Sequence, residues 1–285
     1  MVENKNIGGQ AVIEGVMFKA ENRVSIAVRN PKGEIKVKNQ KFKSLTKNPI
    51  LGWPLIRGII ILFETLILGM KALNHSANVS VSEEGEEELG FWSLLFTFVF
   101  AILLALFLFK FIPLFVADVL VDIGNKYLFN MVEGVVKLGI LVGYIYVISL
   151  MPDVKRVFQY HGAEHKVVNA FEHGKNVTLE NAKSFSTIHP RCGSSFIVFV
   201  LFLSIIVYIF VPLDYGFWLK FLVRLALLPF IAGIAYELIK LSGKYRKNKV
   251  LLALISPGLL LQKMTTREPD EKQLEVALRA FKEVQ

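Results

Sequence analysis

The sequence predicts a mainly α, multi-pass membrane protein with about four transmembrane helices, a re-entrant or interfacial helix and a small β-rich N-terminal cytosolic module. Of its 285 residues, 53% are hydrophobic, which exceeds the roughly 45–50% apolar content of soluble domains. These residues form long blocks separated by charged segments, as in proteins that cross a bilayer several times. The net charge of +9 is explained by lysine-rich segments beside the apolar blocks, so no nucleic-acid partner is expected.

Residues 1–48 are expected to form the β-rich module on the cytosolic side. Between residues 8 and 43 apolar and polar residues alternate loosely, and Asn30-Pro31-Lys32-Gly33 is a strong turn signal between two strand-like runs. Gly8 and Gly9 open this region and would allow a tight turn or a close backbone approach.

Residues 49–90 are expected to hold an amphipathic or re-entrant helix followed by an acidic loop. Arg57, Glu64 and Lys71 are spaced by seven, so they lie on one narrow stripe of an otherwise apolar helix. Two interpretations remain open. The helix lies on the membrane surface, or it enters the membrane with its charged stripe facing protein.

Four apolar segments are expected to span the membrane as two pairs, within residues 91–151 and 192–241. The first, 91–109, has nineteen uncharged residues and nearly crosses a ~30 Å hydrocarbon core. The other spans are 135–151, 192–213 and 216–241. Lys137, Lys220, Arg224 and Glu237 fall within them, and these ions should lie near helix ends or face the bundle.

The distribution of basic residues predicts the orientation in the cell membrane. Eleven lysines and arginines precede or include Arg57, six lie in the histidine-rich loop 152–191, and nine lie in the tail 242–285. With four spans, all three segments fall on one side, which the positive-inside rule makes cytosolic. The tail should contain an amphipathic helix that starts after Pro269 and packs on the cytosolic module. Its apolar stripe consists of Leu274, Ala277, Leu278 and Phe281.

The histidine-rich loop carries the strongest chemical signal. Three of the five histidines lie in YHGAEHKVVNAFEHG, residues 160–174, which reads as a helix ended by Gly174. His161 and His165 are four residues apart on its apolar face, so both imidazoles can reach one metal ion. Glu164 lies at the flank of that face. The order His-x-x-Glu-His is also that of the inverzincin metalloproteases, in which the glutamate acts as general base.

His189 and Cys192, three residues apart before an apolar span, add two further ligands suited to Zn²⁺ or another divalent transition metal. Four protein ligands would form a closed structural site, whereas three ligands would leave a position open for catalysis. Glu14, Glu172 and Arg191 are possible additional site residues. Glu172 lies about 10.5 Å along the helix axis from His165, too far for easy sharing of an ion. Satisfied core histidines and a small buried cysteine are the alternative without metal.

Four stretches together resemble the YqhQ-like family of bacterial membrane proteins: GGQAVIEGVM, YHGAEHK, HPRCGSSF and PGLLLQKMTTREPDEKQLEVAL. The resemblance covers nearly the whole chain. It implies a multi-pass bacterial membrane protein from a domain family of unknown function that is described as predicted metal-dependent enzymes. The matched motifs contain His161, Glu164, His165, His189 and Cys192, with Glu14 in the first.

The leading hypothesis is a metal-dependent hydrolase at the cytosolic face of the membrane, with Glu164 as the base. The main alternative is a membrane assembly or scaffold factor with a structural zinc site. A transporter is a weaker alternative, favoured only by charged residues such as Lys137, Arg224 and Glu237 in the spans. The bilayer is the only partner that the sequence predicts.

Overall fold

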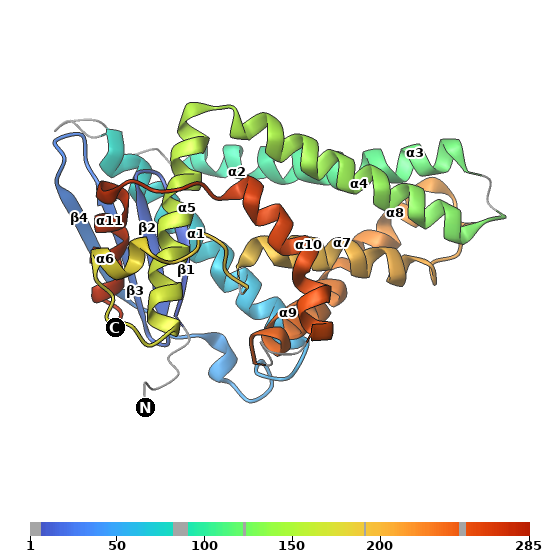
Figure 1. Ribbon diagram of the computed structural model, residues 1–285. Coiled ribbons are helices and arrows are strands. Elements are labelled where there is room, and N and C mark those ends of the chain that lie inside the picture. Colours follow the sequence, from blue (N-terminus) through green and yellow to red (C-terminus); the bar gives the residue numbers. More distant parts are fainter. Residues whose placement is uncertain (1–6, 82–90, 122–123, 191, 245–248) are drawn as a thin grey trace.

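The computed structural model describes residues 7–81, 91–121, 124–190, 192–244 and 249–285. Most of the acidic loop and Arg191 lie outside this part of the chain. A small sheet and its covering helices form one end of the molecule, and a bundle of long helices extends away from it (Figure 1). The mainly helical architecture and the N-terminal β-rich module are both confirmed.

The sheet has four antiparallel strands in the order β1-β2-β3-β4, which is also their order in the chain. Their bounds are β1 Ile7–Val12, β2 Gly15–Ala20, β3 Arg23–Arg29 and β4 Ile35–Lys41. The turn between β3 and β4 contains Gly33 at φ +86°, a backbone conformation that favours glycine. The predicted Asn30–Gly33 turn is therefore where the sequence places it.

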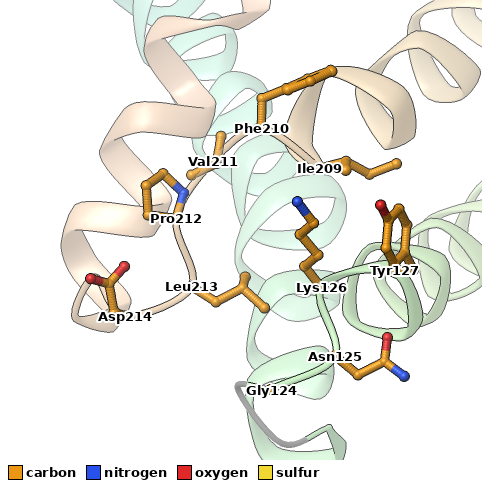
Figure 2. A pocket seen from close by; sticks show the side chains of 10 residues that line it. All are labelled: Gly124, Asn125, Lys126, Tyr127, Ile209, Phe210, Val211, Pro212, Leu213 and Asp214. Carbon is orange, nitrogen blue, oxygen red and sulfur yellow. The ribbon is translucent and has the colours of Figure 1, made fainter.

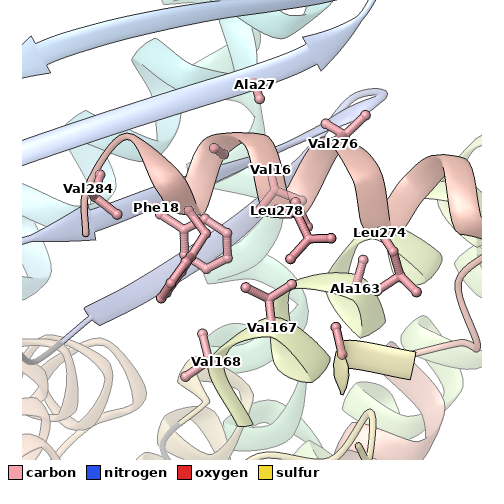
Figure 3. Close-up of a cluster of buried hydrophobic side chains, with 14 of the residues drawn as sticks. Val16, Phe18, Ala27, Ala163, Val167, Val168, Leu274, Val276, Leu278 and Val284 are labelled. Atoms are coloured by element: carbon pink, nitrogen blue, oxygen red, sulfur yellow. The ribbon is translucent and has the colours of Figure 1, made fainter. Parts of the chain in front are cut away.

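Helices from distant parts of the chain cover both faces of this sheet. α5 (Pro152–Glu172), α6 (Leu179–Lys183) and α11 (Glu271–Lys282) bury one face around Phe18 (Figure 3). The rings of Phe18 and Phe281 meet edge to face, with centroids 5.4 Å apart. The other face packs on Leu68 and Ala72 of α1 (Ile56–Val81). The sheet is thus the layer between an early helix and the C-terminal half of the chain.

The C-terminal helix confirms the predicted amphipathic pattern. Asp270 caps α11 through a reciprocal capping box with Gln273, which satisfies backbone donors at the helix start. The predicted apolar stripe is buried against the sheet and α5: Leu274, Ala277, Leu278 and Phe281.

The charged stripe of α1 faces protein at two of its three positions. Arg57 pairs with Glu237 at 2.5 Å, and Glu64 accepts the backbone N–H of Leu45 at 2.5 Å. Large apolar side chains remain exposed along another part of α1, among them Phe63 at 62% exposure. The protein-facing charges match the interpretation in which the charged stripe faces protein, and the exposed apolar side chains suit contact with lipid.

Within the described residues, three helices of the bundle are long and apolar enough to cross a membrane: Leu95–Leu120, Lys126–Ser149 and Phe217–Leu241. The first joins α2 (Phe91–Leu106) to α3 (Ile112–Leu120) through a π-helical turn, Phe107–Phe111. The second is α4 (Lys126–Ser149), and the third joins α8 (Phe217–Ala226) to α9 (Leu228–Lys244). α7 (Gly193–Tyr208) is apolar but shorter. α10 (Lys249–Thr265) packs against α7 and leads back to the sheet.

Three predicted spans differ from the observed helices at their ends. The span predicted at 192–213 is helical only over α7 (Gly193–Tyr208), because the chain turns before Pro212. The first helix continues beyond residue 109, because the π-helical turn carries Lys110 to the hydroxyl of Tyr208. The second begins at Lys126 rather than 135, because Glu133 and Lys137 bury their charges against each other inside the bundle. A prediction from hydropathy alone makes such helices too short, because a buried, paired charge inside the helix is read as the end of the apolar segment.

Candidate metal centre

Three of the predicted ligands come together where α5 meets the start of α7. His161 and His165 face the same direction on α5, with ring centroids 4.4 Å apart. His161 Nε2 lies 3.2 Å from Cys192 Sγ, and ligand atoms of all three residues lie within 4.8 Å of one another. This donor group of His161, His165 and Cys192 is mostly buried, and His161 is its most exposed member.

Backbone carbonyls hold the two histidine rings by their other nitrogens. His161 Nδ1 lies 2.8 Å from the Thr265 carbonyl oxygen, and His165 Nδ1 lies 2.5 Å from that of Thr187. A carbonyl can only accept, so each Nδ1 carries the proton and each neutral ring keeps its lone pair on Nε2. Metal-binding histidines are typically oriented in this way.

Nε2 of His165 is buried without a regular hydrogen bond among the described residues, although the Cys192 side chain acts on this ring. Its side chain is 1% exposed, and burial is the main cause that lowers the pKa of His165. The ring is therefore held in the neutral form that binds metals. A buried nitrogen without a hydrogen-bond partner is rare in folded proteins.

Cys192 is placed by the helix that follows it. It is the N-cap of α7, and its Sγ accepts from the Ser194 hydroxyl at 3.2 Å and the Ser194 backbone N–H at 3.4 Å. These donors and the positive end of the helix dipole face the sulfur. The environment suits a negatively charged ligand atom.

Gly162 allows the C-terminal segment to approach α5 closely. A Cβ at this position would lie 2.0 Å from the carbonyl oxygen of Arg267, and the Arg267 N–H donates to the Phe158 carbonyl at 2.9 Å. This direct backbone contact places Thr265, two residues earlier, beside His161. Helix propensity alone predicts that Gly162 weakens α5. The packing shows that this glycine is what lets the Arg267 backbone lie directly against the helix.

Glu164 is buried at the flank of the donor group, with 7% exposure. Burial is the largest influence on its carboxyl and raises the pKa of Glu164, while His161 and His189 oppose that rise. The Gly9 backbone N–H also hydrogen-bonds this carboxyl. A Cβ on Gly9 would lie 2.6 Å from Glu164 Cγ, so the strand β1 approaches the carboxyl closely only because residue 9 is glycine.

His189 lies near this site but outside the donor group. Its Nε2 is 3.2 Å from Glu172 Oε2, and its ring centroid is 5.7 Å from that of His165. Gln262, which is fully buried, accepts the His189 N–H at 2.9 Å and donates to its carbonyl at 2.9 Å. The structure thus joins Glu172 to His189 rather than to His165.

Glu14 has a structural environment of its own. It occupies the β1–β2 turn at φ +49°, and its carboxylate is bound by Arg156 at 2.5 Å and by the Tyr160 hydroxyl at 3.2 Å. The structure therefore does not bring it to the donor group. Arg191 lies outside the described residues.

Several residues that support the site were not identified from the sequence. Asn169, one turn after His165, donates to the carbonyls of Ser186 and Ile188 at 2.8 and 3.0 Å. These bonds fix the loop whose Thr187 carbonyl orients His165. Asn169 is four residues from His165 on the same helix face, and this spacing was the available signal.

Comparison with known proteins agrees with the resemblance in the motifs. The family model described as "Protein of unknown function (DUF1385)" matches residues 53–285. An "Uncharacterized protein YqhQ" from Bacillus subtilis (strain 168) is 38% identical over 291 residues, which cover 97% of this chain and 91% of that protein. No solved structure matches. The chain belongs to this DUF1385 family of YqhQ-like proteins.

Proposed function

We propose that this protein is a metal-dependent hydrolase at the cytosolic face of the bacterial membrane. His161, His165 and Cys192 would hold Zn²⁺ or another divalent transition metal. The observation that carries the proposal is the convergence of two Nε2 atoms and one sulfur within 4.8 Å, with both Nδ1 atoms held by carbonyls. Imidazole and thiolate are the preferred ligands of zinc.

The number of donors supports a catalytic site over a closed one. Structural zinc sites have four protein ligands, whereas catalytic sites have three and an open position. His189 would be the fourth ligand, but its ring nitrogen Nε2 lies 3.2 Å from Glu172 Oε2, and Gln262 holds its backbone. Three donors therefore leave one coordination position for a reacting group.

Glu164 is the residue proposed to move the proton. A metal ion in the donor group would act as a Lewis acid and activate a water molecule. The Glu164 carboxyl is buried beside His161, where it would take the proton from that water. The backbone N–H of Gly9 donates to this carboxyl, and the close approach of residue 9 restricts its position.

The proposed topology puts this chemistry at the inner membrane surface. The sheet, α5 and α11 carry much of the basic charge and would be cytosolic. A four-span arrangement would add α7 to the three long helices, with α1 on the membrane surface. Substrates would then be molecules that reach the cytosolic side of the bilayer.

A structural zinc site in a scaffold protein is the second candidate function. One observation favours it: the donor group and its carbonyls join three segments that are distant in sequence, namely α5, residues 187–192 and Thr265. A metal there would stabilise the junction between sheet and bundle. The variants below distinguish the two functions.

The metal content of the purified full-length protein tests the donor group. We expect roughly one zinc-type ion per chain, as one tetrahedral site requires. His165→Ala should weaken metal affinity by more than about 100-fold, because even outer-shell partners contribute 10–100-fold. His173→Ala is the matched control, since its ring contacts Asn169 and lies outside the donor group. Equal metal content in both variants would refute the site.

Glu164→Gln separates the enzyme from the scaffold. The variant keeps the shape of the side chain and removes its charge, so it should fold, insert and bind metal as the wild type does. It should nevertheless fail to restore the phenotype of a strain that lacks its own copy. A scaffold predicts the reverse: Glu164→Gln is silent, while Cys192→Ser lowers protein abundance because a lost ligand removes folding free energy.

Neighbouring glycines provide a test of how Glu164 is positioned. The methyl group of Gly9→Ala would meet Glu164 Cγ, Cδ and Oε1 at 2.6–2.8 Å, whereas Gly8→Ala meets nothing within 4 Å. Gly9→Ala should therefore displace the carboxyl, cost about 1–3 kcal/mol of stability and reduce function while metal remains bound. Complementation and metal content are measured for both variants. Indistinguishable behaviour of the two would show that β1 does not position Glu164.

A further inference from the structure

A second group of polar side chains surrounds the ring of Tyr208, inside the helix bundle. Lys110 Nζ, Lys137 Nζ and Arg224 Cζ lie 5.0, 4.8 and 5.2 Å from the ring centroid. Lys110 donates to the Tyr208 hydroxyl at 2.7 Å, and that hydroxyl donates to the Arg224 carbonyl at 3.0 Å. We call these residues, with Glu133 and Asn130, the cationic cluster.

The described part of this cluster contains more positive than negative charge. Glu133 is its only carboxylate: it pairs with Lys137 and lies 3.4 Å from Arg224 Nη1. Three cations and one carboxylate give a formal charge of +2 at ordinary ionisation. The neighbouring Lys220 does not change this sum, because it pairs with Asp118.

The cluster is buried where uncompensated charge is expensive. Lys137 is 5% exposed, and Arg224, Tyr208 and Glu133 are 2% exposed or less. Residues on three helices that can cross the membrane contribute to it. Isolated charges at such depth are strongly unfavourable and typically mark functional sites.

Arg224 also has hydrogen-bonding capacity that the described residues leave unused. Nη2 donates to Asn130 Oδ1 at 3.1 Å and Nη1 faces Glu133 Oε2 at 3.4 Å, but Nε is buried without a hydrogen-bond partner among those residues. Buried guanidinium donors normally bind an oxyanion or a carbonyl. The free Nε–H donor of Arg224 and the excess positive charge of the cluster therefore both suit an anionic ligand.

We propose that the cationic cluster binds an anion of the phosphate class, as free phosphate or as a lipid headgroup. A phosphate group carries up to about two negative charges and several acceptor oxygens, which match the excess charge and the Arg224 donors. The cluster is separate from the metal centre. Cys192 and Tyr208 lie at opposite ends of α7, whose 16 residues rise by about 24 Å.

The cationic cluster lies toward the end of the bundle that is opposite the sheet, and its residues do not line the hollow at that end. Glu133 and Lys137 lie only about 10 and 16 Å along α4 from its start at Lys126. At this end an open hollow of about 580 Å³ lies between the start of α4 and the segment 209–214, which directly follows Tyr208. Figure 2 shows the Lys126 side chain among the residues that line it.

The test is phosphate binding by the full-length protein in lipid nanodiscs. Chelator is present throughout to remove any contribution from the metal centre. In phosphatidylcholine nanodiscs, inorganic phosphate should raise the thermal unfolding midpoint in a saturable way. A midpoint raised by phosphatidylglycerol alone would assign the ligand to a lipid headgroup and also support the proposal.

Lys110→Met and Lys126→Met form the matched pair of variants. Among the described residues Lys110 contacts the Tyr208 hydroxyl, while Glu133 pairs with Lys137, so replacing Lys110 leaves no buried acid unpaired. It should raise the apparent Kd for the effective anion at least about tenfold, because one charged contact is lost. Lys126 is exposed at the start of α4, and its replacement should leave the Kd unchanged.

Three outcomes would overturn the proposal. The first is a midpoint that neither inorganic phosphate nor phosphatidylglycerol changes. The second is equal affinity in the wild type and Lys110→Met. The third is an equal loss in Lys126→Met, which would show that exposed lysines alone attract the anion.

Discussion

The direct contact of α5 with the backbone of the C-terminal segment is the constraint on which the rest of the structure depends. At Gly162 the helix lies against the carbonyl of Arg267 without an intervening side chain, and Arg267 in turn donates to Phe158. This contact fixes Thr265 beside His161 and starts the segment that carries α11 onto the sheet. Gly162 therefore links the orientation of the His161 ring to the packing of α11 on the β-sheet.

The short helix α7 connects two polar interiors of different character. At its N-terminus Cys192 lies beside two imidazoles, and together these groups suit a cation. At its C-terminus Tyr208 is surrounded by cations, which suit an anion. The rest of α7 is almost entirely apolar, so the two sites are separated by a hydrophobic layer. This separation allows each to be altered independently.

Local patterns in the sequence predicted the elements that depend on local physics. The 3.6-residue periodicity identified α5 and α11, Gly174 ended the first at φ +68°, and Asp270 began the second. The His161–His165 spacing on one helical face and the nearby Cys192 gave the donor group. The hydropathy pattern located apolar helices, and three of those in the described part of the chain are long and apolar enough to cross a membrane.

Contacts between distant segments could not be read from the sequence. Nothing in the sequence around His189 indicates that Glu172 contacts its ring or that Gln262 contacts its backbone, because Glu172 lies on α5 and Gln262 lies on α10. The role of Gly9 depends on β1 lying against α5, and that of Gly162 depends on the path of residue 267. The charges at Lys137 and Arg224 were expected at helix ends or facing the bundle, but their arrangement around one tyrosine required the tertiary structure.

X-ray absorption spectroscopy at the metal edge of the purified zinc-loaded protein tests the central claim most directly. The arrangement of His161, His165 and Cys192 predicts one sulfur at about 2.3 Å, two imidazole nitrogens at about 2.0–2.1 Å and one further light ligand. A first shell without sulfur would contradict the donor group. A shell of three imidazoles and one sulfur would show that His189 closes the site and would contradict an open catalytic position.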